Sequence, residues 1–137
     1  MTQDIALGIG CDRNTPHETL AQVIDEALQR LGRDWSAVKA VASIDLKADE
    51  GAMQQLMQQR GCDIRFYSAA QLAQVPVPNP SETVRKYTGT PSVSEAAALL
   101  VAGADGQPAP MSALLIEKHK LRGPDGRNAT VSVAAVG

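Results

Sequence analysis

Residues 5–32 read IALGIGCDRNTPHETLAQVIDEALQRLG and predict a strand, a turn and a helix in that order. The apolar run from 5 to 10 is short and ends in glycine, as a buried strand does. Thr15, Pro16 and Glu18 predict a helix start, with Thr15 as the N-cap and Glu18 completing a capping box. The apolar side chains that follow share one helical face, and a glycine closes it: Leu20, Val23, Ile24, Ala27, Leu28 and Leu31.

The same alternation continues along the chain. Apolar runs at 37–44 and 64–67 predict two further strands, and the segment between them predicts an amphipathic helix that ends at Gly61. Ser68 and Gln71 predict the start of a short helix. The proline-rich stretch at 75–80 cannot be regular structure, because proline removes backbone donors and fixes φ.

The last third of the chain predicts more helix and then a hairpin. A short helix is expected at 81–87 with Ser81 as its cap, and Ser92 with Glu95 predicts a reciprocal capping box ahead of the apolar segment 96–102. Strands are expected at 114–116 and 130–136. A polar connection at 119–128 would join them as an antiparallel hairpin.

This order of elements predicts an α/β fold in one domain spanning residues 1–137. We expect a three-layer α/β/α arrangement around a mainly parallel, mixed sheet of about five strands, with the antiparallel hairpin at its C-terminal end. The length of 137 residues suits one domain with a sizeable core.

The composition excludes several classes of protein. Hydrophobic residues make up 44% and charged residues 20% of the chain, as in ordinary globular domains, and no apolar run is long enough to span a membrane. The net charge of −2 argues against a general nucleic-acid binder. Two cysteines and no visible secretory signal favour a reduced, cytoplasmic setting without a disulfide framework. The second half of the chain contains a local cluster of cations, which forms either a solvated loop or an anion-facing surface. These residues are Lys118, Lys120, Arg122 and Arg127.

Ligands of open α/β sheets bind where the parallel strands end and helices begin, which selects three corners of this chain. The first, 8–15, has a Gly-x-Gly start but Arg13 where a dinucleotide fingerprint needs its third glycine. It therefore predicts a glycine-lined anion site reinforced by Arg13, or glycines that serve the turn alone. Cys11 is either an activated thiol at this helix start or a packed, inert one. We expect no metal, because neither histidine has a ligand partner at a recognised spacing. No cofactor is expected either.

The second corner, 43–50, offers candidates for acid–base chemistry. Asp45, Lys47 and Glu50 lie close enough to shift one another's pKa values, with a carboxylate as general base and Lys47 stabilising an oxyanion. They could equally be a helix cap and a surface ion pair. The third corner is 89–92, where Thr90 lies just outside the cap formed by Ser92.

Several segments, taken together and in register, resemble the CobE proteins and the C-terminal domain of the CbiG proteins of cobalamin biosynthesis. The resemblance runs from about residue 5 to 136, and the segments that carry it are 8–15, 42–50, 66–72, 78–82, 89–99, 117–118 and 130–134.

The resemblance implies a role at the corrin-forming stage of cobalamin biosynthesis, with a precorrin as ligand and other enzymes of that pathway as possible partners. Neither nucleic acid nor a membrane is expected as a partner. Whole CbiG proteins open the δ-lactone of cobalt-precorrin-5A and release acetaldehyde, but this chain corresponds to their C-terminal domain only. Two functions therefore stay open: an accessory protein that binds the precorrin, or a lactone hydrolase in its own right. A nucleotide-binding regulator, a third class, rests only on Gly8 and Gly10.

A precorrin is a flat apolar macrocycle fringed with carboxylates, so its binding calls for separated anion sites around an open cleft. Helix starts at the three corners, with Arg13, Lys47 and Lys118, would provide them. We expect the ligand-binding residues to be Gly10, Cys11, Arg13, Thr15, Ser43, Thr90, Ser92, Glu95 and Lys118.

Overall fold

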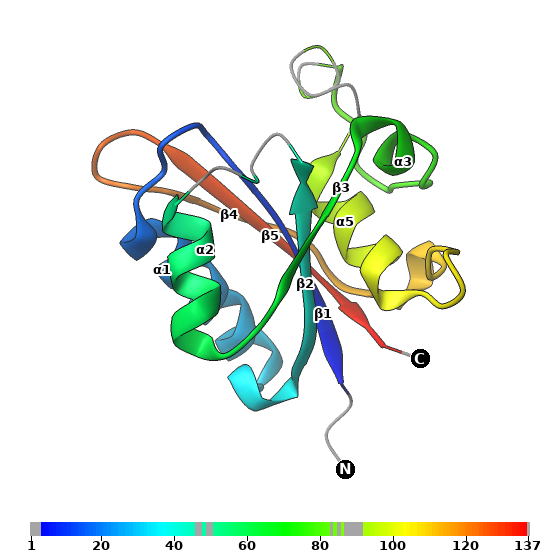
Figure 1. Cartoon of the computed structure of the whole chain (residues 1–137), viewed down its shortest axis with the longest axis horizontal. Helices are drawn as coiled ribbons and strands as arrows, with labels where there is room; N and C mark the ends of the chain where they lie inside the picture. Colours follow the sequence, from blue (N-terminus) through cyan, green and yellow to red (C-terminus); the bar gives the residue numbers. More distant parts are fainter. Residues whose placement is uncertain are drawn as a thin grey trace.

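The computed structural model describes residues 4–45, 48, 51–82, 84, 86 and 92–136. A central sheet lies between two helical layers, with α1 and α2 on one face and α3 and α5 on the other (Figure 1). The strands are β1 (Ile5–Cys11), β2 (Val38–Ile44), β3 (Ile64–Tyr67), β4 (Leu114–Arg122) and β5 (Asn128–Ala135), and the helices are α1 (His17–Leu31), α2 (Gly51–Arg60), α3 (Ala69–Ala73) and α5 (Val93–Ala102). Two short 3-10 turns, Trp35–Ala37 and Met111–Ala113, lead into β2 and β4.

The sheet has the order β3-β2-β1-β5-β4 and is mixed. β1, β2 and β3 are parallel, whereas β5 is antiparallel to both of its neighbours. β4 consequently runs in the same direction as the first three strands, and only β5 is reversed. The expected three-layer fold with a mixed five-stranded sheet and a C-terminal antiparallel hairpin is confirmed.

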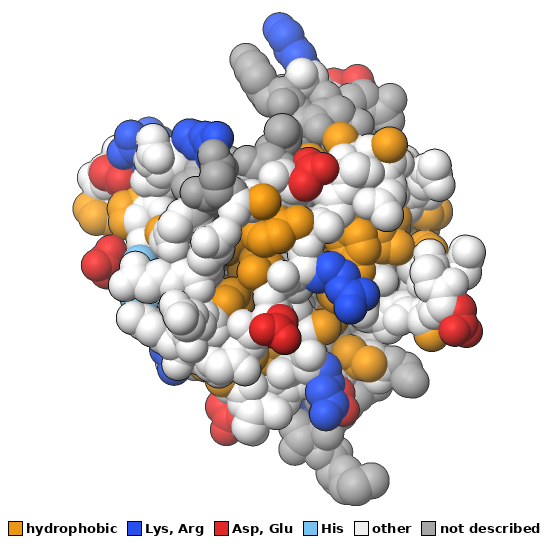
Figure 2. Space-filling model, viewed as in Figure 1, with side chains coloured by type: hydrophobic (Ala, Val, Ile, Leu, Met, Phe, Trp, Pro, Cys, Tyr) orange, Lys and Arg blue, Asp and Glu red, His pale blue; other side chains and the backbone are white. Residues whose placement is uncertain are grey.

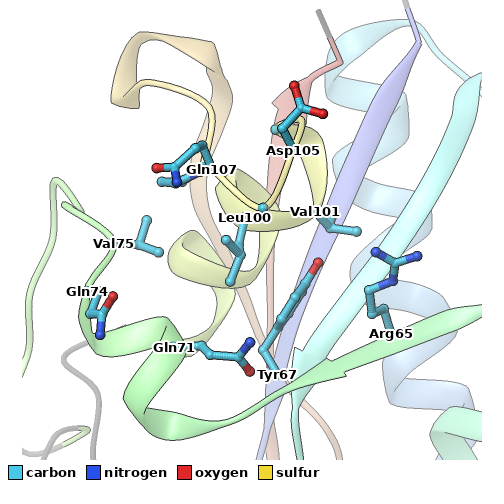
Figure 3. Close-up of a pocket in the computed structure, with 12 residues that line it drawn as sticks. Arg65, Tyr67, Gln71, Gln74, Val75, Leu100, Val101, Asp105 and Gln107 are labelled. Atoms are coloured by element: carbon cyan, nitrogen blue, oxygen red, sulfur yellow. The ribbon is translucent and has the colours of Figure 1, made fainter.

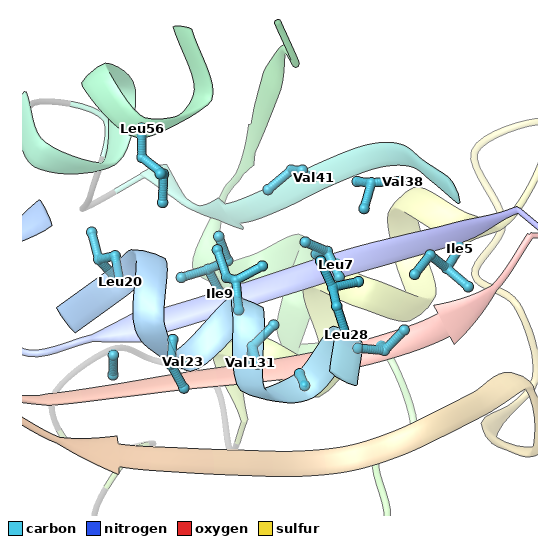
Figure 4. Close-up of a cluster of buried hydrophobic side chains, with 14 of the residues drawn as sticks. Ile5, Leu7, Ile9, Leu20, Val23, Leu28, Val38, Val41, Leu56 and Val131 are labelled. Atoms are coloured by element: carbon cyan, nitrogen blue, oxygen red, sulfur yellow. The ribbon is translucent and has the colours of Figure 1, made fainter. Parts of the chain in front are cut away.

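The first core lies between the sheet and the helices α1 and α2. Figure 4 shows Leu20 and Val23 of α1 directed at Ile9 and Val131 of the sheet, with Leu56 of α2 beside them. The buried positions of α1 follow the three- and four-residue spacing in the sequence. The apolar face predicted for this helix is therefore the face that packs on the sheet.

The second core is thinner, because α5 lies very close to β1. A Cβ atom at Gly8 would lie 1.9 Å from the carbonyl oxygen of Ser94 and 2.5 Å from the amide nitrogen of Ala98. Only glycine permits this approach of a helix backbone to a strand. The buried alanines of α5 complete the contact. The glycine of the Gly-x-Gly sequence at position 8 thus serves helix packing.

Several helix ends follow their predicted signals. Gly32 is in the left-handed conformation (φ 64°), and Arg33 N donates to the Leu28 carbonyl to close α1. Gly61 ends α2 in the same way (φ 69°). Ser68 and Gln71 form the expected capping box of α3, and Ser81 Oγ accepts from Val84 N in the next helical turn.

Two local predictions are wrong. α1 begins one residue later than expected, with Pro16 as its N-cap, because the Thr15 hydroxyl donates to the carbonyl oxygens of Asp12 (2.7 Å) and Asn128 (3.3 Å) instead. The hairpin strands are also longer than expected, so Lys118, Lys120 and Arg122 lie on β4 and not in a loop. No helix in the described part of the chain is long and apolar enough to cross a bilayer.

Candidate functional site

The carboxyl ends of β1 and β2 lie beside the start of α5, as the sheet rule predicts. A Cβ atom at Gly10 would lie 3.8 Å from Val93 Cβ at the first turn of α5, which is ordinary van der Waals contact. The fold therefore does not require glycine at position 10, in contrast to Gly8. Ser43 is fully buried, and its hydroxyl donates to the Ile9 carbonyl (2.7 Å), which ties β2 to β1 just before this edge.

The first predicted corner, residues 8–15, is hydrogen-bonded to the β4–β5 hairpin. Asp12 N donates to the Asn128 carbonyl, and the Asp12 carboxylate accepts from both the backbone and the side-chain amide of Asn128 (2.8 and 3.0 Å). Arg127 donates to the Arg13 carbonyl (3.1 Å) and pairs with Asp125. These contacts fix the backbone of the corner and leave the Arg13 side chain on the surface.

The cysteines pack against the hydrophobic core, and the histidines form side-chain hydrogen bonds. Cys11 and Cys62 are half-buried and pack against the first core, and burial, with a smaller contribution from Asp63, raises the pKa of the Cys62 thiol. His119 is hydrogen-bonded to Glu26 (2.8 Å) and His17 to Gln59 (2.8 Å). In the described ranges, no three His, Cys, Asp or Glu side chains gather as a metal site would require.

The second corner is described only in part. Asp45 is exposed at the end of β2, where its carbonyl accepts from Ala48 N (3.0 Å). Lys47 and Glu50, its proposed catalytic companions, lie outside the described residues, as does Thr90 at the third corner.

The start of α5 does not form the predicted capping box. Ser92 is the N-cap, but its hydroxyl makes no capping hydrogen bond. Glu95 does not reach back to Ser92, because its carboxylate is used elsewhere: Oε2 accepts from Asn79 Nδ2 (2.6 Å), and Oε1 lies 3.9 Å from Lys118 Nζ. Contacts of Glu95 with residues distant in the sequence thus take the place of the predicted capping box with Ser92.

A β-bulge in β4 brings two charged side chains to this place. Ile116 pairs with Val133 and His119 with Val131, so two residues of β4 face the single residue Ser132. Ser132 Oγ donates to the Glu117 carbonyl (2.6 Å) and so holds the bulge. Glu117 and Lys118 both reach the α5 side as a result, where Asn79 Nδ2 also donates to Glu117 (3.1 Å).

The structure thus gathers Ser92, Glu95 and Lys118 with two residues that our sequence analysis did not select, Asn79 and Glu117. We call these five residues the α5 cluster. Asn79 lies within the proline-rich stretch 75–80 and Glu117 lies in an edge strand, so neither stands out by local pattern. Both nevertheless occur in segments that carry the family resemblance, 78–82 and 117–118, and that was the available signal.

Two hollows in the surface lie outside the α5 cluster. One of about 520 Å³ lies between β3, α3 and the 103–108 loop, where Figure 3 shows Tyr67 and Leu100 at its centre with Arg65, Gln71 and Asp105 around them. The other, of about 480 Å³, lies by the amino ends of β2 and β3. Figure 2 shows that hydrophobic side chains reach the viewed face of the molecule between charges of both signs.

Comparison with known proteins places the chain among its relatives. Residues 5–134 match the family described as Cobalamin synthesis G C-terminus. The chain belongs to this family. It is 39% identical to Protein CobE of Sinorhizobium sp over 101 residues, which cover 72% of this chain and 66% of that protein. It is 36% identical to a cobalt-precorrin-5A hydrolase of Priestia megaterium over 96% of this chain, but spans only 32% of that enzyme.

Solved structures of the same family agree with the fold. A CobE from the cobalamin biosynthetic pathway superposes with a TM-score of 0.80 at 31% identity, covering 100% of this chain and 93% of that one. The cobalamin biosynthesis protein chiG of Agrobacterium tumefaciens gives a TM-score of 0.64 at 25% identity, covering 95% and 96%. The chain is therefore a cobalamin-biosynthesis protein of the CobE and CbiG C-terminal family, and the family resemblance in the sequence is confirmed.

Proposed function

We propose that this chain binds a precorrin intermediate at the carboxyl edge of its sheet, as an accessory protein of corrin formation. The observation that carries the proposal is the family match over residues 5–134. The geometry supports the location, because Gly10 leaves room beside the first turn of α5. Arg13, exposed at the neighbouring corner, offers a cation to the carboxylate fringe of such a ring.

Titration with uroporphyrin, a tetrapyrrole with eight carboxylates, tests this proposal. We expect its absorbance band to shift on binding, with a Kd of about 100 μM or tighter, the usual range for metabolites. The variant Arg13→Met should weaken binding about fivefold, equivalent to about 1 kcal/mol for an exposed ionic contact. Lys39→Met, which removes an exposed charge near the amino end of β2, is the matched control and should change little. Absence of binding by the wild-type chain would refute the proposal.

A second function, lactone hydrolysis by this chain itself, is favoured by the identity with the Priestia megaterium hydrolase across nearly the whole chain. Asp45 or Glu50 would act as general base for water, and Lys47 would stabilise the oxyanion. Release of acetaldehyde from a lactone-bearing precorrin by the purified chain would support it. Full activity in the double variant Asp45→Asn/Glu50→Gln would remove these residues from the mechanism.

The chain matches only 32% of the length of the Priestia megaterium hydrolase. Two thirds of the hydrolase have no counterpart in this chain. We infer that this chain delivers or presents the bound ring to another enzyme of the pathway. Addition of the chain to such an enzyme should then raise its turnover, measured as acetaldehyde released per minute.

A further inference from the structure

The sheet has two edge strands, and they differ in how well they are protected from pairing with another chain. β4 carries a bulge and alternating cations, two features that block such pairing. β3, at the other edge, pairs with β2 in an unbroken parallel register and contains neither a bulge nor a proline. In Figure 1, β3 crosses the front of the view with no labelled element before it. Within the described part of the chain, the outer side of β3 is therefore open to a further strand.

The open edge carries apolar side chains that reach the surface. The chain has four aromatic residues, and two of them, Phe66 and Tyr67, lie half-buried in this strand. Cys62, Ile64 and Phe66 pack against the first core, on the α1 and α2 side. Figure 2, in the same view, shows hydrophobic side chains at the surface between charges of both signs. Aromatic side chains are enriched in surfaces that bind another protein, so this edge has the composition of an interface.

Two opposite charges lie on the other face of the same segment. Asp63 and Arg65 are exposed, and both line the hollow by the amino ends of β2 and β3. Residues two apart in a strand point to the same face, so the two charges form a row along the edge. Neither side chain has an ion pair or a hydrogen bond in the part of the chain that the structure describes. A strand with the complementary row of charges would pair both.

The strand that supplies this complementary row is β3 itself, in reverse. We propose that β3 pairs antiparallel with β3 of a second copy of the chain, about a two-fold axis through Ile64. Asp63 then lies opposite Arg65 of the partner subunit, and Arg65 lies opposite Asp63 of the partner subunit. On the other face, Ile64 meets its own counterpart and Cys62 lies opposite Phe66 of the partner subunit. These apolar pairs join the first cores of the two copies.

The other symmetric registers of this segment match less well. Facing residues must point to the same side of the sheet, so the axis passes through a residue. An axis through Asp63 or Arg65 places like charges opposite each other, which is destabilising. An axis through Phe66 places Ile64 opposite Ser68 and leaves Asp63 without an opposite charge. Among these registers, only the axis through Ile64 pairs both charges with their opposites.

This dimer would leave the proposed ligand edge free. β2 lies between β3 and β1, so Gly10 and Arg13 at the carboxyl end of β1 lie away from the two-fold axis. Each copy would bind its own ligand, whether or not the dimer forms. We therefore expect Arg65→Asp to bind uroporphyrin with the wild-type affinity.

Reversal of the two charges tests the pairing in solution. We expect sedimentation equilibrium of the wild-type chain to show a dimer with a Kd of about 10 μM, as for a small interface. Asp63→Arg and Arg65→Asp each place like charges opposite each other, and each should raise this Kd at least about tenfold. An equimolar mixture of the two variants restores both pairs of opposite charges and should form a heterodimer with about the wild-type Kd. Lys120→Asp, a charge reversal at an exposed position of the β4 edge, is the matched control and should change the Kd by less than about twofold.

Disulfide formation tests the register. In the Cys11→Ser/Cys62→Ser background, Ile64→Cys places two thiols opposite each other at the axis, so mild oxidation should give a covalent dimer. In the same background, Phe66→Cys is the control, since its two thiols lie apart and should give no covalent dimer.

Several outcomes would overturn the proposed dimer. They are a wild-type chain that stays monomeric at about 1 mM, no heterodimer in the mixture, dissociation by Lys120→Asp, and a covalent dimer from Phe66→Cys but not from Ile64→Cys. A dimer that behaves as expected but binds no uroporphyrin would instead refute only the proposed tetrapyrrole binding.

Discussion

The Ser92 hydroxyl occupies an N-cap position without acting as a cap, which reverses the usual expectation for its removal. Ser→Ala at a working N-cap costs about 1 kcal/mol. Here the hydroxyl is buried and unpaired, so a methyl group in its place loses no hydrogen bond and removes a desolvation cost. We expect the free energy of unfolding of Ser92→Ala, measured by urea denaturation, to equal or exceed that of the wild type.

Ser68 provides the internal comparison, because its hydroxyl accepts from Gln71 N in a complete capping box. Ser68→Ala should lose about 1 kcal/mol in the same experiment. A loss of that size in Ser92→Ala would mean that Ser92 caps α5 in solution after all.

The Cys62 thiol allows a prediction about pH. Burial raises its pKa above the ordinary value, and the neighbouring Asp63 charge adds to the shift. A raised pKa keeps more of the group protonated at a given pH, so the reactive thiolate forms only at higher pH. In Cys11→Ser, which leaves Cys62 as the single cysteine, alkylation by iodoacetamide should be slower at pH 8 than that of free glutathione, with the rate rising at higher pH.

Replacement of Asp63 separates the two causes. Asp63→Asn removes the smaller one, so the alkylation profile should move only slightly towards lower pH. A profile that matches glutathione in the parent variant would contradict the raised pKa. The raised pKa of Cys62 also makes the free energy of unfolding depend on pH. The contribution of the protonated thiol to stability is fully present below the pKa of Cys62 in the unfolded chain, and it is lost as the pH rises through the pKa in the folded protein.

One substitution made at two positions of β1 should have very different effects on stability. In Gly8→Ala the new Cβ would overlap the α5 backbone, 1.9 Å from the Ser94 carbonyl oxygen, and relief requires the helix to move. We expect a loss of about 3 kcal/mol, the upper part of the range for overpacking, and a melting temperature about 10 °C lower.

In Gly10→Ala the new Cβ meets Val93 at an ordinary distance, so the melting temperature should stay within about 3 °C of the wild type. The added methyl group fills part of the space beside α5, and uroporphyrin binding should weaken. Unchanged binding in this variant would show that the ligand does not approach β1 at Gly10.

Some ends of the helices and strands could be predicted from the sequence, and others could not. Helix ends set by short-range geometry, such as the glycines at 32 and 61, were predicted correctly because a left-handed residue stops a helix wherever it occurs. Capping boxes were less predictable. Ser68 forms one, whereas Glu95 is drawn away by Asn79 and Lys118, which are distant in sequence. The length of β4 was missed because its bulge and alternating cations hide the period of a strand.

The candidate site was predictable only in outline. The rule that ligands bind where parallel strands end selected the edge at which Ser92, Glu95 and Lys118 lie together. Their meeting with Asn79 and Glu117 depends on the bulge opposite Ser132 and on the path of the proline-rich segment. Neither has a local signal, so the negative charge of the cluster could not be foreseen.

The proposed ligand edge and the larger hollow are separate places in the molecule. The hollow of about 520 Å³ lies between β3, α3 and the 103–108 loop, with an apolar centre at Leu100 and amide groups of glutamines around it (Figure 3). By size alone it would be the default binding site of a small domain. The proposed edge is favoured instead by the room beside Gly10 and by the exposed Arg13 at the neighbouring corner.

Filling the hollow decides between these two places. Gln74 is exposed on its rim at the end of α3, so Gln74→Trp should fold normally while the indole ring occupies the space above Leu100. If the tetrapyrrole binds at the carboxyl edge, uroporphyrin should bind this variant within about twofold of the wild type, whereas Arg13→Met loses about fivefold, or about 1 kcal/mol. Titration of both variants in one buffer measures this. Lost binding in Gln74→Trp with normal binding in Arg13→Met would place the ligand in the hollow, and the cations of the edge would then have no part in holding it.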